Sequence, residues 1–315
     1  MKEIQTMAAR VEDYLVARRQ MGFDLDIAGS QLLAFARFAD EAGHGGPITL
    51  DLAVRWARSA SRPTALTMAR RIEVLRPFAK YSAQFEPGTA ILPNRYFGPA
   101  HRRLVPHIYT GQEIASMLSA ASRLMPVGGL RPLTYRTLFG LLAATGLRVS
   151  EARLLKVEDV DFQCHLLTVR QTKFRKSRLV PLDPSVVSAL DCYTKTRAKM
   201  FGGAKVDAFF VSDLGKPLAD RTIHHNFEQL RSELGWTPRG GHARPRIHDL
   251  RHTFICGILL RSYQQNQRID HVIDALSTYV GHAKVSDTYW YISAVPELMA
   301  AAAQRFVPLP AGGEL

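Results

Sequence analysis

The side chains of this sequence that could do chemistry are mainly arginines and histidines set in apolar, helix-forming segments. Arg148 lies in AATGLRVSEARLL, directly after a glycine turn and at the expected start of a helix. A helix N-terminus attracts anions, and an arginine there can bind a phosphate through two hydrogen bonds. Taken alone, the more ordinary interpretation is a surface ion pair with Glu151, three residues further along the helix.

A second group of such residues lies in RPRIHDLRHTFICGILL. His248 and Arg251 are three residues apart, so they share one face of a helix, and His252 lies beside them. The apolar run that follows predicts that this helix is half buried. An imidazole and a guanidinium in its first turn are costly to desolvate unless an anion meets them. The alternative is a capping arrangement with Asp249.

A third group combines a histidine with aromatic residues. His282 follows Gly281, a predicted helix end, and nine residues later comes Tyr291, the last residue of a Tyr-Trp-Tyr triplet that begins at Tyr289. The alternatives are a histidine that binds the last helical carbonyls and rings that pack in a core. Spacing alone does not identify any tyrosine as a nucleophile.

Two lysines, Lys173 and Lys176, flank a predicted hairpin turn in QTKFRKSRLVPL. A charged turn is usually only solvated, but a lysine at a hairpin tip can reach into a groove or donate a proton.

Several kinds of catalytic site have no support in the sequence. It contains no phosphate-binding loop, no dinucleotide fingerprint, no HExxH helix and no GxSxG elbow. No dense carboxylate cluster indicates a two-metal nuclease. The three cysteines, Cys164, Cys192 and Cys256, form no CxxC pair, so neither a zinc site nor a disulfide framework is predicted. We therefore expect a protein without a metal or a cofactor.

The secondary structure predicted around these residues divides into two parts. Apolar residues recur with a helical period over 4–20, 27–42, a stretch capped by Thr49 that stops before Pro63, and 64–81. Proline and glycine then interrupt the pattern. We predict a helical domain over 1–84, a linker over 85–107 and a larger domain over 108–315.

The larger domain is predicted to be mainly α with a small antiparallel β-sheet. Helical stretches cover 110–124, 130–144 and 150–155, and helices return at 185–200 and over most of 219–305. Between them, VEDVDF, HLLTVRQT and SRLVPL alternate as strands do, and KFRK is the turn between the last two. A further short strand is expected at AFFVS.

Composition and charge indicate the kind of partner. The 315 residues are 46% hydrophobic, and 41 Lys and Arg against 28 Asp and Glu give a net charge of +13. Such an excess is typical of proteins that bind a polyanion, most often nucleic acid. The basic residues of the first domain are either a solvated helix face or a surface that follows DNA phosphates; they are Arg55, Arg58, Arg62, Arg70, Arg71, Arg76 and Lys80.

Targeting signals are missing from the sequence. The N-terminus has no apolar signal-peptide core, and there is no apolar run long enough to span a bilayer. We therefore expect a cytoplasmic protein without a membrane partner.

The order of the motifs resembles that of the tyrosine recombinase, or phage-integrase-like, family. Four motifs follow one another in the family's order and at similar separations. They are an arginine in ATGLRVSE, a lysine before RLVPL, the HDLRH segment, and a GH followed nine residues on by a tyrosine. The resemblance covers roughly 108–305, and the N-terminal bundle resembles the family's core-binding domain more loosely. It implies a two-domain, C-shaped DNA clamp. The ending TYWYISAVPELMAAAAQRF also resembles recombinases carried by transposons.

The resemblance implies a role for each motif. Arg148 and Arg251 would clamp the non-bridging oxygens of one phosphate, and His282 would add a hydrogen bond. His248 would accept or hold the proton of Tyr291, which attacks phosphorus. Lys173 would be the general acid that protonates the departing 5′ oxygen, and Glu151 would be an acidic residue that supports the site. The rivals are Lys176 for the general acid and Tyr289 for the nucleophile.

These roles agree with the chemistry of phosphoryl transfer. Charge gathers on the equatorial oxygens, so a cationic clamp is the main requirement. A tyrosine hydroxyl has a pKa of about 10, so it needs a base or a positive field. A phosphotyrosine keeps the energy of the phosphodiester, so rejoining needs no ATP.

The predicted function is site-specific DNA cleavage and rejoining through a 3′-phosphotyrosine and a Holliday junction. The family implies a homotetramer on two DNA duplexes, formed from monomers or dimers. We also expect Arg175 and Lys176 to contact DNA. The segment AVPELMAAAAQRF is expected to form a helix that docks either on a neighbouring subunit or on its own chain. The alternatives are a type IB topoisomerase that relaxes DNA and a catalytically silent DNA-binding regulator.

Overall fold

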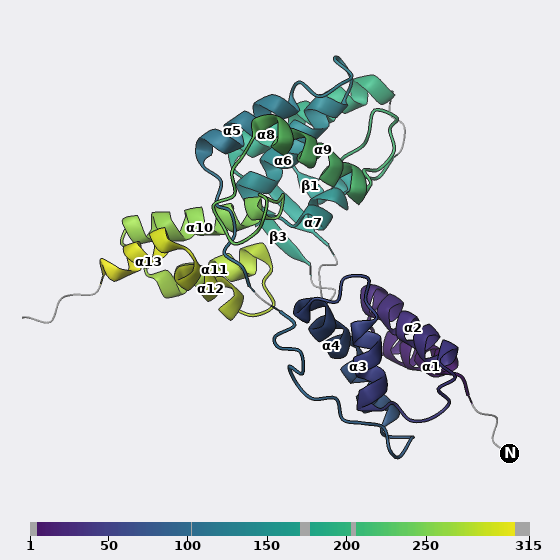
Figure 1. Cartoon of the computed structure of the whole chain (residues 1–315). Helices are drawn as coiled ribbons and strands as arrows, with labels where there is room; N and C mark the ends of the chain where they lie inside the picture. Colours follow the sequence, from purple (N-terminus) through teal and green to yellow (C-terminus); the bar gives the residue numbers. More distant parts are fainter. Residues whose placement is uncertain (1–4, 102, 171–176, 203–205, 306–315) are drawn as a thin grey trace, which may run out of the picture. The chain divides into compact units, whose positions relative to one another are not determined.

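The computed structural model describes residues 5–101, 103–170, 177–202 and 206–305. The chain divides into two compact units, Met1–Arg103 and Leu104–Leu315 (Figure 1). Three of the residues predicted to act on DNA, Lys173, Arg175 and Lys176, lie outside the described residues.

The first unit is a bundle of helices. It contains α1 (Met7–Gln20), α2 (Asp26–Glu41), α3 (Leu50–Arg58) and α4 (Ala65–Ser82). Threonine side chains cap three of the helices by accepting a hydrogen bond from the backbone N–H three residues further on; they are Thr6, Thr49 and Thr64. The helices enclose an aromatic core in which the rings of Phe35 and Trp56 meet edge to face, 5.2 Å apart. The predicted helical bundle is confirmed.

The second unit is mainly helical around a three-stranded sheet. Its first part contains α5 (Gly111–Ala121), α6 (Arg131–Thr145), α7 (Val149–Arg153), β1 (Val160–Asp161), β2 (Leu166–Val169) and β3 (Arg178–Pro181). Its second part contains α8 (Pro184–Phe201), α9 (Asp220–Leu234), α10 (Asp249–Gln264), α11 (Ile269–Val280), α12 (Ser286–Ala294) and α13 (Pro296–Ala303). The sheet order is β1-β2-β3, both pairs are antiparallel, and Leu167 pairs with Val160 and Val180. The predicted fold class is therefore confirmed.

The strand expected at AFFVS does not form. Residues 208–212 make only isolated bridges, at Ala208 and at Val211. Phe209, Phe210 and Val211 are all buried, so this segment does not alternate between a buried and an exposed face. Its backbone is held instead by single hydrogen bonds to other segments, such as the one from the Phe209 N–H to the carbonyl of Leu155 at 2.7 Å. The apolar run predicted as a strand is therefore a buried loop.

Two apolar cores stabilise the second unit. The larger one surrounds the sheet and α6, α8 and α9, and the smaller one joins α10, α11, α12 and α13 through buried residues that include Ile255, Ile273 and Leu298. Gly146 links them, because it ends α6 in a left-handed conformation and a Cβ there would lie 2.5 Å from the ring of Phe254 on α10. The close packing of α6 on α10 thus requires glycine at this position.

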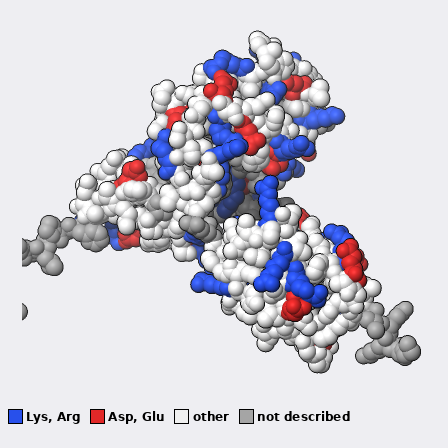
Figure 2. Space-filling view, in the orientation of Figure 1, with Lys and Arg blue, Asp and Glu red and all other residues white. Residues whose placement is uncertain are grey.

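The described helices include none that is long and apolar enough to cross a membrane. Figure 2 shows basic side chains on the visible faces of both units.

Candidate active site

Three arginines from distant parts of the second unit meet at the C-terminal end of α11. Each donates a hydrogen bond to a different one of three consecutive carbonyl groups there, which carry the partial negative charge of the helix end. The bonds run from Arg178 Nε to Tyr279 (2.7 Å), from Arg251 Nη2 to Val280 (2.6 Å) and from Arg148 Nη2 to Gly281 (2.9 Å). The predicted sites at Arg148 and Arg251 are thereby brought together beside His282.

Glu151 lies between two of these arginines and is almost completely buried. Its Oε1 accepts from Arg148 Nη1 at 2.7 Å and from Arg178 Nη1 at 3.1 Å, and its Oε2 accepts from Arg178 Nη2 at 2.9 Å. Burial alone would raise the pKa of Glu151, but the hydrogen bonds from Arg178 and from the Arg148 backbone hold it below its ordinary value. The carboxylate is therefore ionised at neutral pH.

Arg148 combines the two interpretations of its sequence, an ion pair with Glu151 and an arginine that is open to a phosphate. It forms the ion pair with Glu151, and its side chain is still 31% exposed to solvent. A guanidinium carries five N–H donors, so the bonds to Glu151 and Gly281 leave some for an external anion.

Arg251 is the buried member of the pair. It is 3% exposed, and its Nη1 donates to the carbonyl of Gly146 at 2.7 Å. Burial, followed by the charge of Arg148, lowers the pKa of Arg251 to about 10. The group remains a cation at neutral pH, and an anion beside it would relieve the repulsion from Arg148.

His248 and His252 lie at the beginning of α10. Their ring planes are perpendicular, and their ring centroids are 4.8 Å apart. His248 keeps an exposed edge, but the burial of the rest of its ring, followed by the charge of Arg251, lowers its pKa to about 4. Burial, followed by repulsion from His248 when that ring is protonated, lowers the pKa of His252 to about 2. Both rings are therefore neutral at pH 7, and a neutral imidazole has one nitrogen that accepts a hydrogen bond.

Tyr291 lies against these histidines. Its side chain is buried, and its hydroxyl oxygen is 2.6 Å from Nδ1 of His252. The ring is parallel to that of His282, with centroids 6.4 Å apart. The rival Tyr289 is 49% exposed to solvent. Between the two tyrosines, the structure thus brings Tyr291 into the cluster of arginines and histidines.

His282 is held by the helix that carries Tyr291. Its Nδ1 lies 2.7 Å from the hydroxyl of Thr288, a buried residue of α12. The bond to Thr288 orients the side chain from α12, and the backbone N–H of His282 donates to the carbonyl of Ser277 on α11.

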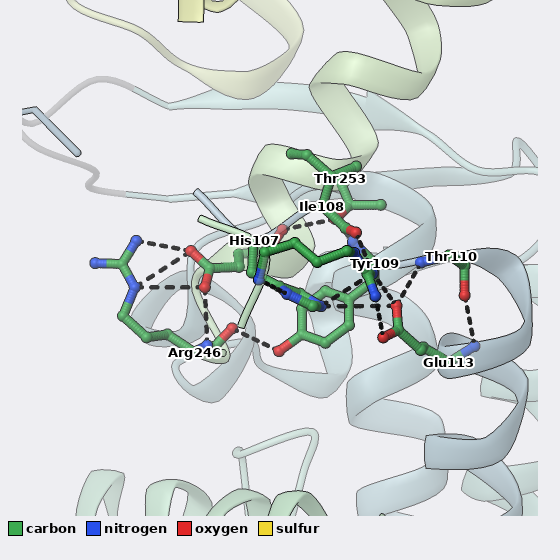
Figure 3. Close-up of polar contacts among 9 residues, drawn as sticks. His107, Ile108, Tyr109, Thr110, Glu113, Arg246 and Thr253 are labelled. Carbon is green, nitrogen blue, oxygen red and sulfur yellow. Dashed lines mark hydrogen bonds and ion pairs between the residues drawn. The ribbon is translucent and has the colours of Figure 1, made fainter. Parts of the chain in front are cut away.

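A second polar network fixes the turn that precedes His248 (Figure 3). The Tyr109 hydroxyl donates to the carbonyl of Arg246 at 3.1 Å, and its N–H donates to the hydroxyl of Thr253 at 2.8 Å. Asp249 is fully buried and accepts from the backbone and side chain of Arg246. The capping arrangement considered for Asp249 exists, but it joins Asp249 to Arg246.

The arginines predicted as a phosphate-tracking surface in the first unit do not all project freely. Arg71 donates to the carbonyl of Trp56 at 2.6 Å and stacks over its indole ring, so it has a structural role. Arg70 and Arg76 donate to backbone carbonyls of the segment that follows α4. Arg55 pairs with Asp51 at the surface. The exposed members also include Arg58, Arg62 and Lys80.

Two residues of the cluster were not singled out from the sequence as site residues. His252 had been noted only as a neighbour of Arg251, and Arg178 had been part of a strand. The available signal for Arg178 was a charged residue at the start of an apolar strand, SRLVPL.

Among the described residues, no group of three or more His, Cys, Asp or Glu could hold a metal ion.

Comparisons with known proteins agree on one family. The phage integrase family model matches residues 108–297. A putative integrase/recombinase of Sinorhizobium fredii, y4rB, is 39% identical over 307 residues, which cover 96% of this chain and 97% of that protein. The tyrosine recombinase XerC of Chlamydia trachomatis is 28% identical over 71% of this chain and 66% of its own length.

Solved structures show the same fold. The XerH site-specific recombinase bound to its palindromic difH substrate matches with a TM-score of 0.66 at 17% identity, over 95% of this chain and 84% of that one. The Tn1549 transposon integrase in complex with transposon right end DNA also matches with a TM-score of 0.66 at 17% identity, over 96% of this chain and 99% of that one.

Proposed function

Because this chain belongs to the phage integrase family of tyrosine recombinases, we propose how its clustered arginines, histidines and tyrosine cut and rejoin DNA. The protein is a site-specific recombinase, and double-stranded DNA is its substrate. The observation that carries the mechanism is the position of the Tyr291 hydroxyl, 2.6 Å from an imidazole nitrogen in the arginine cluster. A phenol buried among cations at such a place is suited to attack a phosphodiester.

Arg148 and Arg251 bind the non-bridging oxygens of the scissile phosphate. Their guanidiniums share the end of α11, so one phosphate can meet both. Charge builds up on these oxygens in the transition state, and fixed cations lower its energy without a metal ion. His282, which follows Gly281 at the end of α11, adds a hydrogen bond to the phosphate.

Tyr291 attacks phosphorus. Its hydroxyl oxygen forms a bond to phosphorus, and the bond from phosphorus to the 5′ oxygen breaks, which leaves a 3′-phosphotyrosine and a 5′ hydroxyl. With its proton on Nε2, His252 accepts a hydrogen bond from the phenol and orients it. Because its pKa is about 2, His252 stays neutral, and the final acceptor of the phenol proton is His248, whose ring centroid lies 4.8 Å from that of His252. The negative phosphate raises the pKa of His248 when it binds.

Lys173 is assigned as the general acid that protonates the departing 5′ oxygen, with Lys176 as its rival. The support is the position of Lys173 in the sequence before RLVPL. The following strand, β3, begins with Arg178, which is part of the arginine cluster.

The larger assembly is also proposed. The helical unit over 1–84, joined by the segment 85–107, would cover one DNA face and the catalytic unit over 108–315 the other. Four subunits on two duplexes would exchange strands through a Holliday junction. In the single chain, α13 packs against α10 and α12, with Leu298 buried. On DNA we propose that α13 docks on a neighbouring subunit, and that the enzyme acts on transposon ends in the cytoplasm.

The test begins by capturing a substrate. Duplexes with a randomised segment and closely spaced nicks are incubated with the protein in EDTA, because a nick lets the cleaved fragment leave and the covalent intermediate accumulate. Captured duplexes are sequenced and placed twice on a plasmid. Deletion or inversion between the two copies is expected. Relaxation of supercoils without exchange would indicate a topoisomerase, and binding without any adduct would indicate a silent regulator.

The same plasmid tests the role of α13. A chain that ends before Pro296 should still form the adduct but should not recombine. Recombination at the rate of the full chain would contradict docking on a neighbour.

A further inference from the structure

Arg178 is a nearly buried cation for which the mechanism above has no use. Its side chain is 10% exposed, and it lies at the start of β3. It donates through all three of its nitrogen atoms, twice to Glu151 and once to the carbonyl of Tyr279. The residue therefore joins three elements: β3, α7 with Glu151, and the end of α11.

Stability alone is a weak reason for such a contact. Removing a guanidinium and a carboxylate from water costs about as much free energy as their attraction returns, so apolar residues of similar volume would often serve as well. What a bidentate ion pair gives instead is a fixed orientation of both groups. The group oriented here is Glu151, which also holds Arg148.

Arg178 also changes the charge that Arg148 presents. Glu151 has a single negative charge, and its Oε1 accepts from both Arg148 and Arg178. With both arginines present, the trio has a net positive charge that a phosphate can use. Without Arg178, the carboxylate would neutralise Arg148 and could rotate to bind it through both oxygens.

The backbone beside Arg178 is shaped to receive its guanidinium. Gly281 has a φ of +69°, and a Cβ there would lie 2.7 Å from Arg178 Nη1 and 2.9 Å from its Cζ. The carbonyl of the same glycine accepts from Arg148, and the next residue is His282. Any side chain at position 281 would therefore displace Arg178 from both contacts.

We propose that Arg178 is a positioning residue for strand cleavage, which sets the orientation and net charge of Arg148 through Glu151 and fixes the end of α11 through Tyr279. The inference rests on the proposed function, because it concerns the phosphate that Arg148 would bind. Arg178 does not touch the reacting atoms itself.

The first experiment is a double-mutant cycle with Arg178→Met and Glu151→Gln. Covalent adduct formation is measured in single turnover at saturating amounts of the captured duplex, and binding is measured separately. Arg178→Met should slow adduct formation about 10- to 100-fold, the effect of a small misplacement of a catalytic group, while affinity changes less than about threefold. In the Glu151→Gln background, the same change should add less than about threefold.

The matched control is Arg170→Met. Arg170 follows β2 of the same sheet and pairs with the buried carboxylate of Asp159, but its side chain is 52% exposed. Rates of Arg178→Met within twofold of this control would overturn the proposal. Losses that multiply fully in the double variant would also overturn it, because Arg178 would then not act through Glu151.

A second measurement separates charge from folding. In a methylphosphonate duplex a methyl group replaces one non-bridging oxygen, so the phosphate is neutral and needs less positive charge. The loss caused by Arg178→Met should shrink at least about fivefold on this substrate, and an undiminished loss would mean a purely structural role. If Arg178→Met does not fold, Arg178→Lys and Gly281→Ala give the same comparison, because a lysine cannot pair with both oxygens in the same way. A wild-type chain that forms no adduct would instead overturn the proposed function.

Discussion

The hydroxyl of Tyr291 lies 2.6 Å from Nδ1 of His252, the residue that directly follows Arg251 in the sequence. Adjacent residues on α10 thus have separate tasks. Arg251 points to the end of α11, where its Nη2 binds a carbonyl, and His252 points to α12, where it meets the phenol. Two adjacent residues of α10 therefore place the Tyr291 phenol relative to the arginine cluster.

His252→Phe should slow adduct formation about 10- to 100-fold and leave DNA affinity within about twofold. The ring shape is kept, but the phenol loses the nitrogen that orients it. Single-turnover cleavage and a binding titration measure the two quantities. His271→Gln, at an exposed histidine of α11, is the control and should behave as wild type. Equal rates for His252→Phe and this control would show that the contact is dispensable.

The free energy of unfolding should fall as the pH drops below about 6.5. Burial depresses the pKa of His252 from 6.5 to about 2 in the folded state, so at pH 5 the unfolded chain binds a proton that the folded chain does not. The stability is complete above the unfolded pKa and should decrease by about 1 to 2 kcal/mol between pH 6.5 and 5. Urea unfolding of wild type and His252→Phe measures it. The variant should show a shallower slope, and identical slopes would contradict the assignment.

The arginines of the first unit should separate into two classes. Arg58→Gln and Arg62→Gln remove exposed charges, so each should weaken DNA binding at low salt and reduce the slope of log affinity against log salt by about 1. Arg71→Gln should instead lower the melting temperature, because it breaks the contacts with Trp56. Unchanged slopes for Arg58 and Arg62 would assign them to a solvated face that does not touch DNA.

The general acid can be identified by changing the leaving group. Lys173→Ala should slow adduct formation strongly on an ordinary duplex, because an alkoxide leaves poorly without a proton. On a duplex with sulfur in place of the bridging 5′ oxygen, the loss should become small, since a thiolate leaves without help. Lys176→Ala should be nearly neutral on both. The opposite pattern would transfer the role to Lys176.

The sequence predicted the elements well where local patterns decide them. Helical periodicity, threonine caps and the alternation in HLLTVRQT and SRLVPL correspond to helices and strands in the structure. It failed at AFFVS, because an apolar run in a buried loop looks like a strand when its backbone partners are unknown.

For the site, the sequence predicted which residue types take part and their order along the chain, but not how they contact one another. Arg178 and Tyr279 are 101 residues apart in sequence, and Arg148 and Gly281 are 133 apart. Neither contact has a local signature, so the use of three carbonyls by three arginines could not be foreseen. For the same reason, the choice of Tyr291 over Tyr289 depended on a spacing rule, whereas the structure separates them by burial.

Denaturing gels of the captured nicked duplex show whether Tyr291 is the nucleophile. Wild type and Tyr289→Phe should both yield a protein–DNA band that survives detergent and forms in EDTA without ATP. Tyr291→Phe should bind the same duplex with unchanged affinity and yield no such band. A band that persists in Tyr291→Phe and disappears in Tyr289→Phe would make Tyr289 the nucleophile.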